Sequence, residues 1–161
     1  MRRGFAPFFC TFVLTAAAAA GQDRLVDLST RAAGAQRVVL ASVSELQSAL
    51  EVNAYGDQVI VSHLQLQVQE TLKGPVVNTI SLAMEGGTVG GLTMRVSDMP
   101  TMAVGERAVF FVDSAPSGEF HAHSRGLGIM KLDTSNHIVG SSLMLDDVRG
   151  IVRTAAVRGQ R

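Results

Sequence analysis

The sequence predicts an all-β, mainly antiparallel domain, and three observations lead to that class. Hydrophobic residues make up 47% of the 161 residues and charged residues only 17%, which favours a folded domain over a disordered chain. Residues 59–72 alternate between a mainly apolar and a mainly polar set, as in a strand with one buried face. Further short apolar runs follow, separated by glycine and proline turns. Short strands at this spacing are typical of a small barrel or sandwich.

One short helix is expected before the strands. In residues 23–35, Leu25, Leu28 and Ala32 recur at helical spacing, and Gly34 provides a stop. The segments that we expect to form strands are residues 37–43, 59–72, 79–84, 92–96, 107–112, 119–124, 129–132 and 138–139.

The alternation within residues 59–72 predicts which side chains are buried. Leu64, Leu66 and Val68 share the apolar face, while Gln65 and Gln67 lie on the opposite face. The expected core includes Val39, Val43, Leu64, Leu66, Val68, Ile80, Leu82, Val109 and Phe111.

The end of the chain differs from the strand region. Gly126 and Gly128 indicate a bulge or a close backbone approach before the last clear strand. Beyond Asp146 the chain carries several arginines, and we expect either a helix or a frayed end. The expected organisation is a signal peptide over residues 1–20, one β domain over residues 21–145 and an Arg-rich tail over residues 146–161.

The first residues have the pattern of a secretory signal peptide. Met1-Arg2-Arg3 is basic, residues 5–20 are almost wholly apolar, and Ala18-Ala19-Ala20 fits a small-x-small cleavage site before Gly21. The apolar run is short for a membrane span, so we expect cleavage, no stable membrane anchor afterwards, and a secreted or periplasmic protein.

Cleavage changes both the charge and the cysteine content. The chain has 14 basic and 14 acidic residues, and the loss of Arg2 and Arg3 leaves 12 basic residues. A chain without a basic surplus is a poor candidate for nucleic-acid binding. Cys10 is the only cysteine and leaves with the signal peptide, so disulfides and thiolate chemistry are excluded from the mature protein.

Four segments carry a resemblance to a known family. They are Arg37-Val38-Val39-Leu40-Ala41-Ser42-Val43, Leu66-Gln67-Val68-Gln69-Glu70-Thr71-Leu72-Lys73-Gly74, Val104-Gly105-Glu106-Arg107-Ala108-Val109-Phe110-Phe111 and Gly126-Leu127-Gly128. In this order they resemble exported bacterial domains built like netrin-type and tissue-inhibitor-of-metalloprotease-type domains. The resemblance implies a small OB-like β-barrel of about five strands, behind the short N-terminal helix. Inhibitors of that family use an N-terminal cysteine, which the mature chain lacks, so the resemblance implies the barrel alone.

The sequence does not predict an enzyme or a cofactor. It contains no G-x-S-x-G, no H-E-x-x-H and no phosphate-binding loop followed by Lys and Ser or Thr. Residues 86–91 are rich in glycine, but a strand and not a helix is expected after them, so they suit a barrel loop better than a phosphate site.

Histidines offer one alternative, a metal site. His121 and His123 lie two residues apart, which places both imidazoles on one face of a strand, and His63 lies on the polar face of the long strand. Zinc or copper needs three or four such ligands together, and exposed strand histidines are the simpler explanation.

Methionines gather in the glycine-rich middle of the chain. Met94, Met99 and Met102, with Arg95, are the candidate residues for contact with a partner, because thioether side chains form adaptable apolar surfaces. The alternatives are packing into the core and a soft copper site.

These observations favour an exported, non-catalytic binding module that contacts a secreted or periplasmic protein, such as a protease. The alternative is a periplasmic metal-binding protein or enzyme that uses His121 and His123 or the methionine-rich region.

Overall fold

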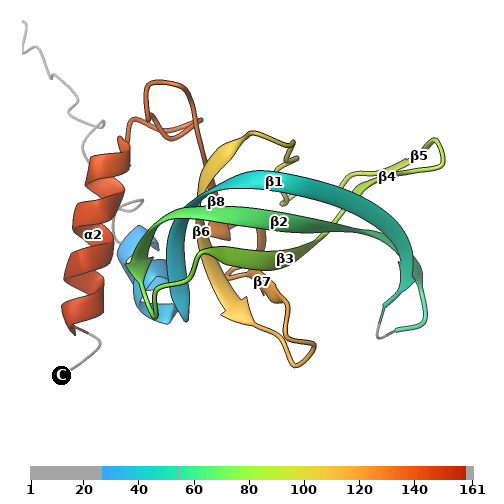
Figure 1. Ribbon diagram of the computed structural model, residues 1–161, viewed down its shortest axis with the longest axis horizontal. Helices are drawn as coiled ribbons and strands as arrows, with labels where there is room; N and C mark the ends of the chain where they lie inside the picture. The colour runs from blue at the N-terminus through green and yellow to red at the C-terminus, as the bar shows by residue number, and fades with distance from the viewer. Residues whose placement is uncertain (1–26, 54, 159–161) are drawn as a thin grey trace, which may run out of the picture.

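The structure is a computed structural model that describes residues 27–53 and 55–158 (Figure 1). It is mostly β, with a helix over residues 27–34 and a second helix, α2 (Leu145–Arg158). The expected signal peptide over residues 1–20 and the cleavage point at Gly21 lie outside the described residues. Within the described residues, no helix is long and apolar enough to cross a membrane.

Eight strands and one short 3-10 helix lie between the two helices. They are β1 (Arg37–Val52), β2 (Gln58–Lys73), β3 (Thr79–Glu85), β4 (Gly87–Val89), β5 (Leu92–Met94), β6 (Arg107–Ser114), β7 (Phe120–Ala122), η1 (Arg125–Gly128) and β8 (Ile129–Leu132).

Six of these strands form one mixed sheet in the order β1-β2-β3-β7-β6-β8, and β1 pairs in addition with β6. Every pair is antiparallel except β3–β7, a short parallel pair in which Leu82 faces Phe120 and Ala83 faces His121. Strands β4 and β5 form a separate hairpin, which projects from the end of the molecule opposite α2 (Figure 1). The prediction of a mainly antiparallel β fold is therefore confirmed.

The predicted faces of β2 are also confirmed. Leu64 and Leu66 are fully buried, whereas Gln65 and Gln67 are exposed. Eight of the nine predicted core residues are buried, and Val68 is the half-buried exception. The strand pairing explains this difference, because β3 pairs with β2 only from Val61 to Gln67. Val68 lies just beyond the paired segment.

The core is divided between the two faces of the sheet. Val39, Leu66 and Phe110 belong to a cluster on one face, whereas Val109 and Phe111 belong to a cluster on the other. Residues 108–112 are buried on both faces, because helix 27–34 and α2 cover the second face. The uninterrupted apolar run in β6 is what a strand covered on both sides requires.

The Arg-bearing tail forms α2, one of the two forms expected from the sequence. Its start is capped, since a carboxylate oxygen of Asp147 accepts the N–H of Met144 at 2.8 Å. Val148 and Val152 are fully buried against the sheet. On the other side, Arg149 Nε donates to Glu70 of β2 at 2.9 Å, so the helix is held by packing and by charge.

Strand β1 is longer than predicted. The sequence predicts that it ends at Val43, but the strand continues to Val52, and its register against β2 shifts between Val43 and Glu45. Before this bulge Val39, Ala41 and Val43 point inward; after it, Leu46, Ser48 and Leu50 do so, as shown by their partners Leu64, Ser62 and Ile60. The bulge shifts the inward positions by one residue and hides the alternation.

The two late glycines do lie in close backbone contacts. A side-chain carbon at Gly126 would collide with the carbonyl of Asp98, and one at Gly128 would collide with the carbonyl of His123. Both glycines belong to η1 and not to a bulge. The expected strand at residues 138–139 is reduced to a bridge between Ile138 and Leu132.

Candidate functional site

Beyond the bulge after Val43, β1 and β2 pair as a two-stranded extension (residues 45–52 and 58–65), which we call the β1–β2 arm. A groove of about 580 Å³ lies between the inner face of this arm, the β4–β5 hairpin and the loop of residues 95–102. We call it the methionine groove, because four methionines line it. All four residues proposed from the sequence for partner contact lie on this one groove. Its lining residues include Leu46, Ser48, Ser62, Met84, Met94, Arg95, Met99 and Met102.

The methionines differ in how deeply they are placed. Met84 is buried at 7% exposure, and Met99 and Met102 are half-buried and pack against the core cluster. Met94, at the end of β5, is half-buried and lines the groove without belonging to that cluster. Met84, Met99 and Met102 therefore both pack in or against the core and line the groove. Met94 lines the groove only.

A pair of serines anchors the β4–β5 hairpin to the arm. Ser48 and Ser62 face each other across β1 and β2, with 2.8 Å between their hydroxyl oxygens, and Ser62 donates to the carbonyl of Gly86 at 2.6 Å. Gly87 has a φ of 141°, and a side-chain carbon there would collide with both hydroxyls. The paired glycines thus let the hairpin lie directly on the serines.

Arg125 and Lys131 fix the loop that forms the outer wall of the groove. Arg125 Nε donates to Asp98 at 2.6 Å, and its Nη2 donates to Glu85 at 3.1 Å. Lys131 Nζ donates to the carbonyl of Thr101 at 3.0 Å. The hydrogen bond from Arg125 lowers the pKa of the Asp98 carboxyl. Because the loop is tied to η1 at Asp98 and to β8 at Thr101, we infer that this wall of the groove is in place before any ligand binds.

Arg95 differs from these basic residues. Its side chain is exposed beside the groove, and within the described residues it makes no hydrogen bond or ion pair. The groove therefore combines methionine and leucine side chains with serine and threonine hydroxyls and two charged groups, Glu85, which is paired with Arg125, and the unpaired Arg95. Such a surface fits an apolar side chain next to a carboxylate.

The sequence indicated the loop and hairpin side of this groove but missed the strand side. Leu46, Ser48 and Ser62 come from β1 and β2, far from the methionines along the chain. One signal was present: Ser62 interrupts the apolar face of β2 and is buried at 4% exposure. A small polar residue on a buried face indicates a specific contact, here with the hairpin.

His63 does not share hydrogen-bond partners with His123. Its Nδ1 lies 3.0 Å from Glu119 and its Nε2 lies 2.6 Å from Glu51. Hydrogen bonds to Glu51 and Glu119, in that order of importance, raise the pKa of His63 above its usual value of 6.5. These contacts tie β1, β2 and the segment before β7 together on the outer face.

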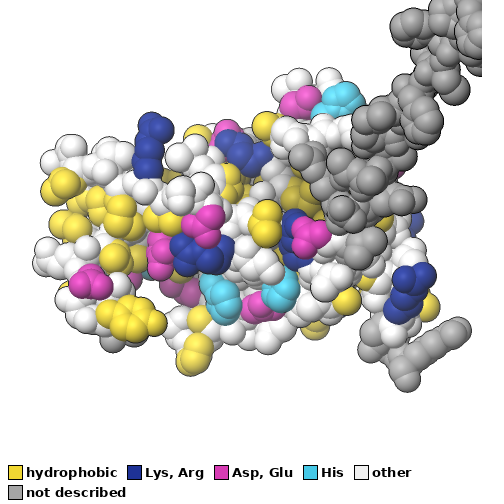
Figure 2. Space-filling view, turned by 180° about the vertical axis from the view of Figure 1, so that it is seen from behind, with side chains coloured by type: hydrophobic (Ala, Val, Ile, Leu, Met, Phe, Trp, Pro, Cys, Tyr) yellow, Lys and Arg dark blue, Asp and Glu magenta, His cyan; other side chains and the backbone are white. Residues whose placement is uncertain are grey.

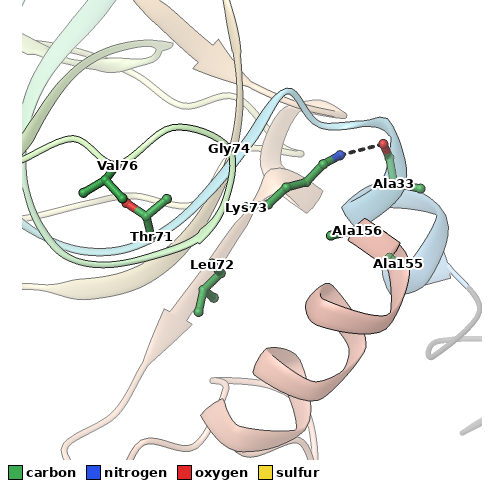
Figure 3. Close-up of a pocket in the computed structure, with 8 residues that line it drawn as sticks. All are labelled: Ala33, Thr71, Leu72, Lys73, Gly74, Val76, Ala155 and Ala156. Atoms are coloured by element: carbon green, nitrogen blue, oxygen red, sulfur yellow. Dashed lines mark hydrogen bonds between the residues drawn. The ribbon is translucent and has the colours of Figure 1, made fainter. Parts of the chain in front are cut away.

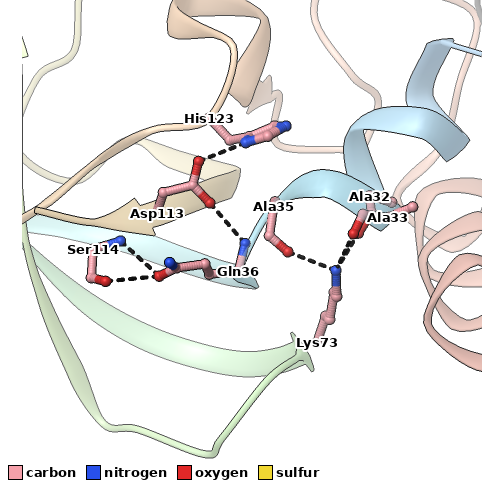
Figure 4. Close-up of polar contacts among 8 residues, drawn as sticks. All are labelled: Ala32, Ala33, Ala35, Gln36, Lys73, Asp113, Ser114 and His123. Atoms are coloured by element: carbon pink, nitrogen blue, oxygen red, sulfur yellow. Dashed lines mark hydrogen bonds and ion pairs between the residues drawn. The ribbon is translucent and has the colours of Figure 1, made fainter. Parts of the chain in front are cut away.

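His121 and His123 lie near Asp113 instead. Strand β7 ends at Ala122, so only His121 belongs to the strand, and it is exposed. His123 Nδ1 lies 2.6 Å from Asp113, which also accepts the N–H of Gln36 at 2.8 Å (Figure 4). Burial alone would raise the pKa of Asp113, but the hydrogen bonds from Gln36 and His123 outweigh it and lower that pKa. Among the described residues, no group of three or more His, Cys, Asp or Glu side chains is arranged to hold a metal ion.

A second cavity, of about 410 Å³, lies between helix 27–34, the end of β2 and α2 (Figure 3). Lys73 reaches out of it to the end of helix 27–34 and donates to the carbonyls of Ala32, Ala33 and Ala35 at 2.8, 2.7 and 2.6 Å (Figure 4). Desolvation lowers the pKa of Lys73. Its three donors satisfy carbonyls that a helix end leaves unpaired, so this lysine has a structural role.

One end of the molecular surface is rich in hydrophobic side chains (Figure 2). Hydrophobic side chains gather at the end of the molecule that carries the β4–β5 hairpin, where some charged groups also lie (Figure 2). Exposed Leu50, Tyr55 and Leu92 belong to the arm and the hairpin at this end. A scan against protein-family models and a search of curated proteins each found no match.

Proposed function

We propose that this chain is an exported, non-catalytic binding module that holds an apolar segment of another exported protein in the methionine groove. The observation that carries the proposal is the meeting of Met94, Met99, Met102 and Arg95 on one groove whose walls are already tied in place. Thioether side chains adapt to different apolar shapes, and a preformed groove reduces the entropy that binding must overcome.

The architecture we infer for this module is a small OB-like barrel. Support comes from the pairing circuit β1–β2–β3–β7–β6–β1, in which the β3–β7 step is parallel and only two residues long. Five strands in such a circuit agree with the resemblance to netrin-type domains. Side chains fill the interior of so small a barrel, which leaves loops and outer faces for binding.

Export and the choice of partner rest on the sequence. The basic start, the apolar run and the alanines before Gly21 favour secretion or release into the periplasm. There the protein would meet other exported proteins, among which a protease is one candidate. The balanced charge of the chain gives no reason to invoke nucleic acid as the partner.

The test uses a photo-crosslinking amino acid at Arg95 and, as a control, at exposed Val139 outside the groove. The exported protein is irradiated in its native extracellular fraction, the crosslinked partner is identified by mass spectrometry, and its affinity is measured with purified components. We expect crosslinks from position 95 only. Met94→Ser should weaken binding about tenfold to a hundredfold, since burial of such a side chain contributes about 1.5–3 kcal/mol.

Met94 is a better position for this test than Met99, because Met99 packs against the core and its loss would also lower stability. Val139→Ser is the matched control, since Val139 is 61% exposed and does not line the groove. Equal crosslinking from both positions, or an affinity that Met94→Ser leaves unchanged, would reject the proposal. A tight stoichiometric metal in the purified protein would instead favour a metal carrier.

A further inference from the structure

The edge of β1 that faces away from β2 is paired over only part of its length. From Arg37 to Ser42 this edge pairs with β6, and the N–H and carbonyl of Val43 bond to Glu106 and Gly105 at 2.9 and 2.8 Å. Beyond Val43, β1 continues along β2 to Val52, and no other described strand pairs with it there. Residues 44–52 thus present an open strand edge without proline or lysine, and their charged residues, Glu45 and Glu51, lie on the face opposite to Leu46.

The bulge after Val43 determines which backbone groups face this edge. The side chain of Val43 points inward while its N–H and carbonyl point away from β2. Side-chain and backbone directions alternate together along a strand, so the later inward residues Leu46, Ser48 and Leu50 also direct their N–H and carbonyl groups to the open edge. This edge therefore offers a row of donors and acceptors.

The open edge runs beside the methionine groove. Leu46 and Ser48 line the groove on the β1 side, while Met94 and Met99 line it on the hairpin and loop sides. A strand added to β1 would lie about 4.8 Å from it and would direct alternate side chains to the face of β1 on which the groove lies. The unpaired guanidinium of Arg95 lies beside the same groove.

We infer that the partner binds as an added β-strand along residues 46–50 of β1, placing apolar side chains on the methionines and a carboxylate on Arg95. This inference rests on the proposed function and specifies its binding mode. A helix could fill an apolar groove, but its backbone groups are already paired internally and would leave those of β1 without partners. The occupant is thus an extended segment of an exported protein with alternating apolar residues and an adjacent acidic residue.

The experiment uses a defined probe, an acetylated ten-residue peptide of alternating threonine and leucine that ends in aspartate. Binding to the exported protein is measured by calorimetry, and amide exchange is followed at Leu46, Ser48 and Leu50. We expect saturable binding and slower exchange at these three amides. N-methylation of alternate peptide nitrogens on the β1 side should weaken binding about tenfold or more, because ladder hydrogen bonds are lost.

Matched variants locate the contact on the protein. Ser48→Pro removes both the hydroxyl and the outward N–H, whereas Ser48→Ala removes the same hydroxyl but keeps the N–H, so the proline variant should bind the peptide about tenfold more weakly than the alanine variant. Arg95→Ala should weaken binding about fivefold, whereas Arg153→Ala, at an arginine on α2 away from the groove, should have no effect. If Ser48→Pro does not fold, the N-methylated peptide provides the same test without altering the protein.

The outcomes separate this inference from the proposed function. If the peptide shows no saturable binding, or if N-methylation leaves its affinity unchanged, strand addition is rejected. If the affinity of the crosslinked partner is still lowered by Met94→Ser, the groove remains a binding site that is used in another mode. If neither the peptide binding nor the dependence of partner binding on Met94 is observed, the proposed binding module is rejected as well. Self-association that Ser48→Pro abolishes would identify a second copy of the chain as the occupant, and so would overturn the inference of a separate partner.

Discussion

Replacing Leu66 by alanine tests whether the inner face of the sheet supplies the main stabilising core. Leu66 is fully buried, and on this face it lies between Val43 of β1 and Ile80 of β3. The change removes three carbon atoms from this position. At about 0.8 kcal/mol for each buried methylene, the lost transfer free energy is about 2.4 kcal/mol.

The void adds to this loss, because strands paired on both sides of Leu66 hold the neighbouring side chains apart. We therefore expect the free energy of unfolding to fall by about 3–4 kcal/mol, within the range of about 2–5 kcal/mol found for such changes. For a domain of this size that corresponds to a Tm lower by roughly 10–15 °C.

The assay is urea unfolding followed by circular dichroism, with Gln67→Ala as the control. Gln67 is the next residue on the same strand, is exposed, and should change the free energy by less than about 0.5 kcal/mol. The slope of the transition should be the same for all three proteins. A loss below about 1 kcal/mol for Leu66→Ala, or an equal loss for Gln67→Ala, would refute the assignment of the faces.

Two further predictions concern the outer face and the hairpin. Because the folded pKa of His63 is raised, its ion pairs stabilise the protein fully below about pH 6.5 while the carboxylates stay ionised, and this stabilisation is lost as pH rises through the raised value. Between about pH 6 and pH 9 the Tm should thus fall more steeply for the native chain than for His63→Gln; parallel curves would contradict this. Gly87→Ala should destabilise the protein by about 1–3 kcal/mol in urea unfolding, because the added carbon meets the serine hydroxyls. Gly91 also has a positive φ, of 83°, but open space around it, so a loss in Gly91→Ala as large as that in Gly87→Ala would show that backbone strain, and not the collision, is responsible.

The extent to which the sequence predicts this fold depends on how the two faces of each strand differ. On β2 one face is buried and the other is wet, so the alternation of Leu64, Gln65, Leu66 and Gln67 predicts the register. On β6 both faces are buried; alternation along a strand places Phe110 and Phe111 on opposite faces, but nothing in the apolar run tells which of the two shares a face with Leu66. Burial could be predicted there, but not the side of the sheet.

The candidate site shows the same limit. Met94, Arg95, Met99 and Met102 are close in the sequence, so one segment could be proposed as a whole. The opposite wall depends on the long-range placement of the β1–β2 arm, and the one-residue bulge after Val43 conceals the inward positions that follow it. Local patterns predict segments, whereas a groove requires the pairing between them.

The pairing of β1 with β6 has a consequence for how the chain folds. Strands β1, β2 and β3 follow one another as neighbours, so their contacts close short loops and can form early. The β1–β6 ladder joins Arg37 to Val112 and Ser42 to Arg107, and the intervening chain must be brought together before that ladder gives any stabilisation. We therefore expect the β1–β2–β3 meander to form early and the docking of β6 to be the slow, rate-limiting step, so that substitutions of the buried residues Ala108 or Phe110 slow refolding.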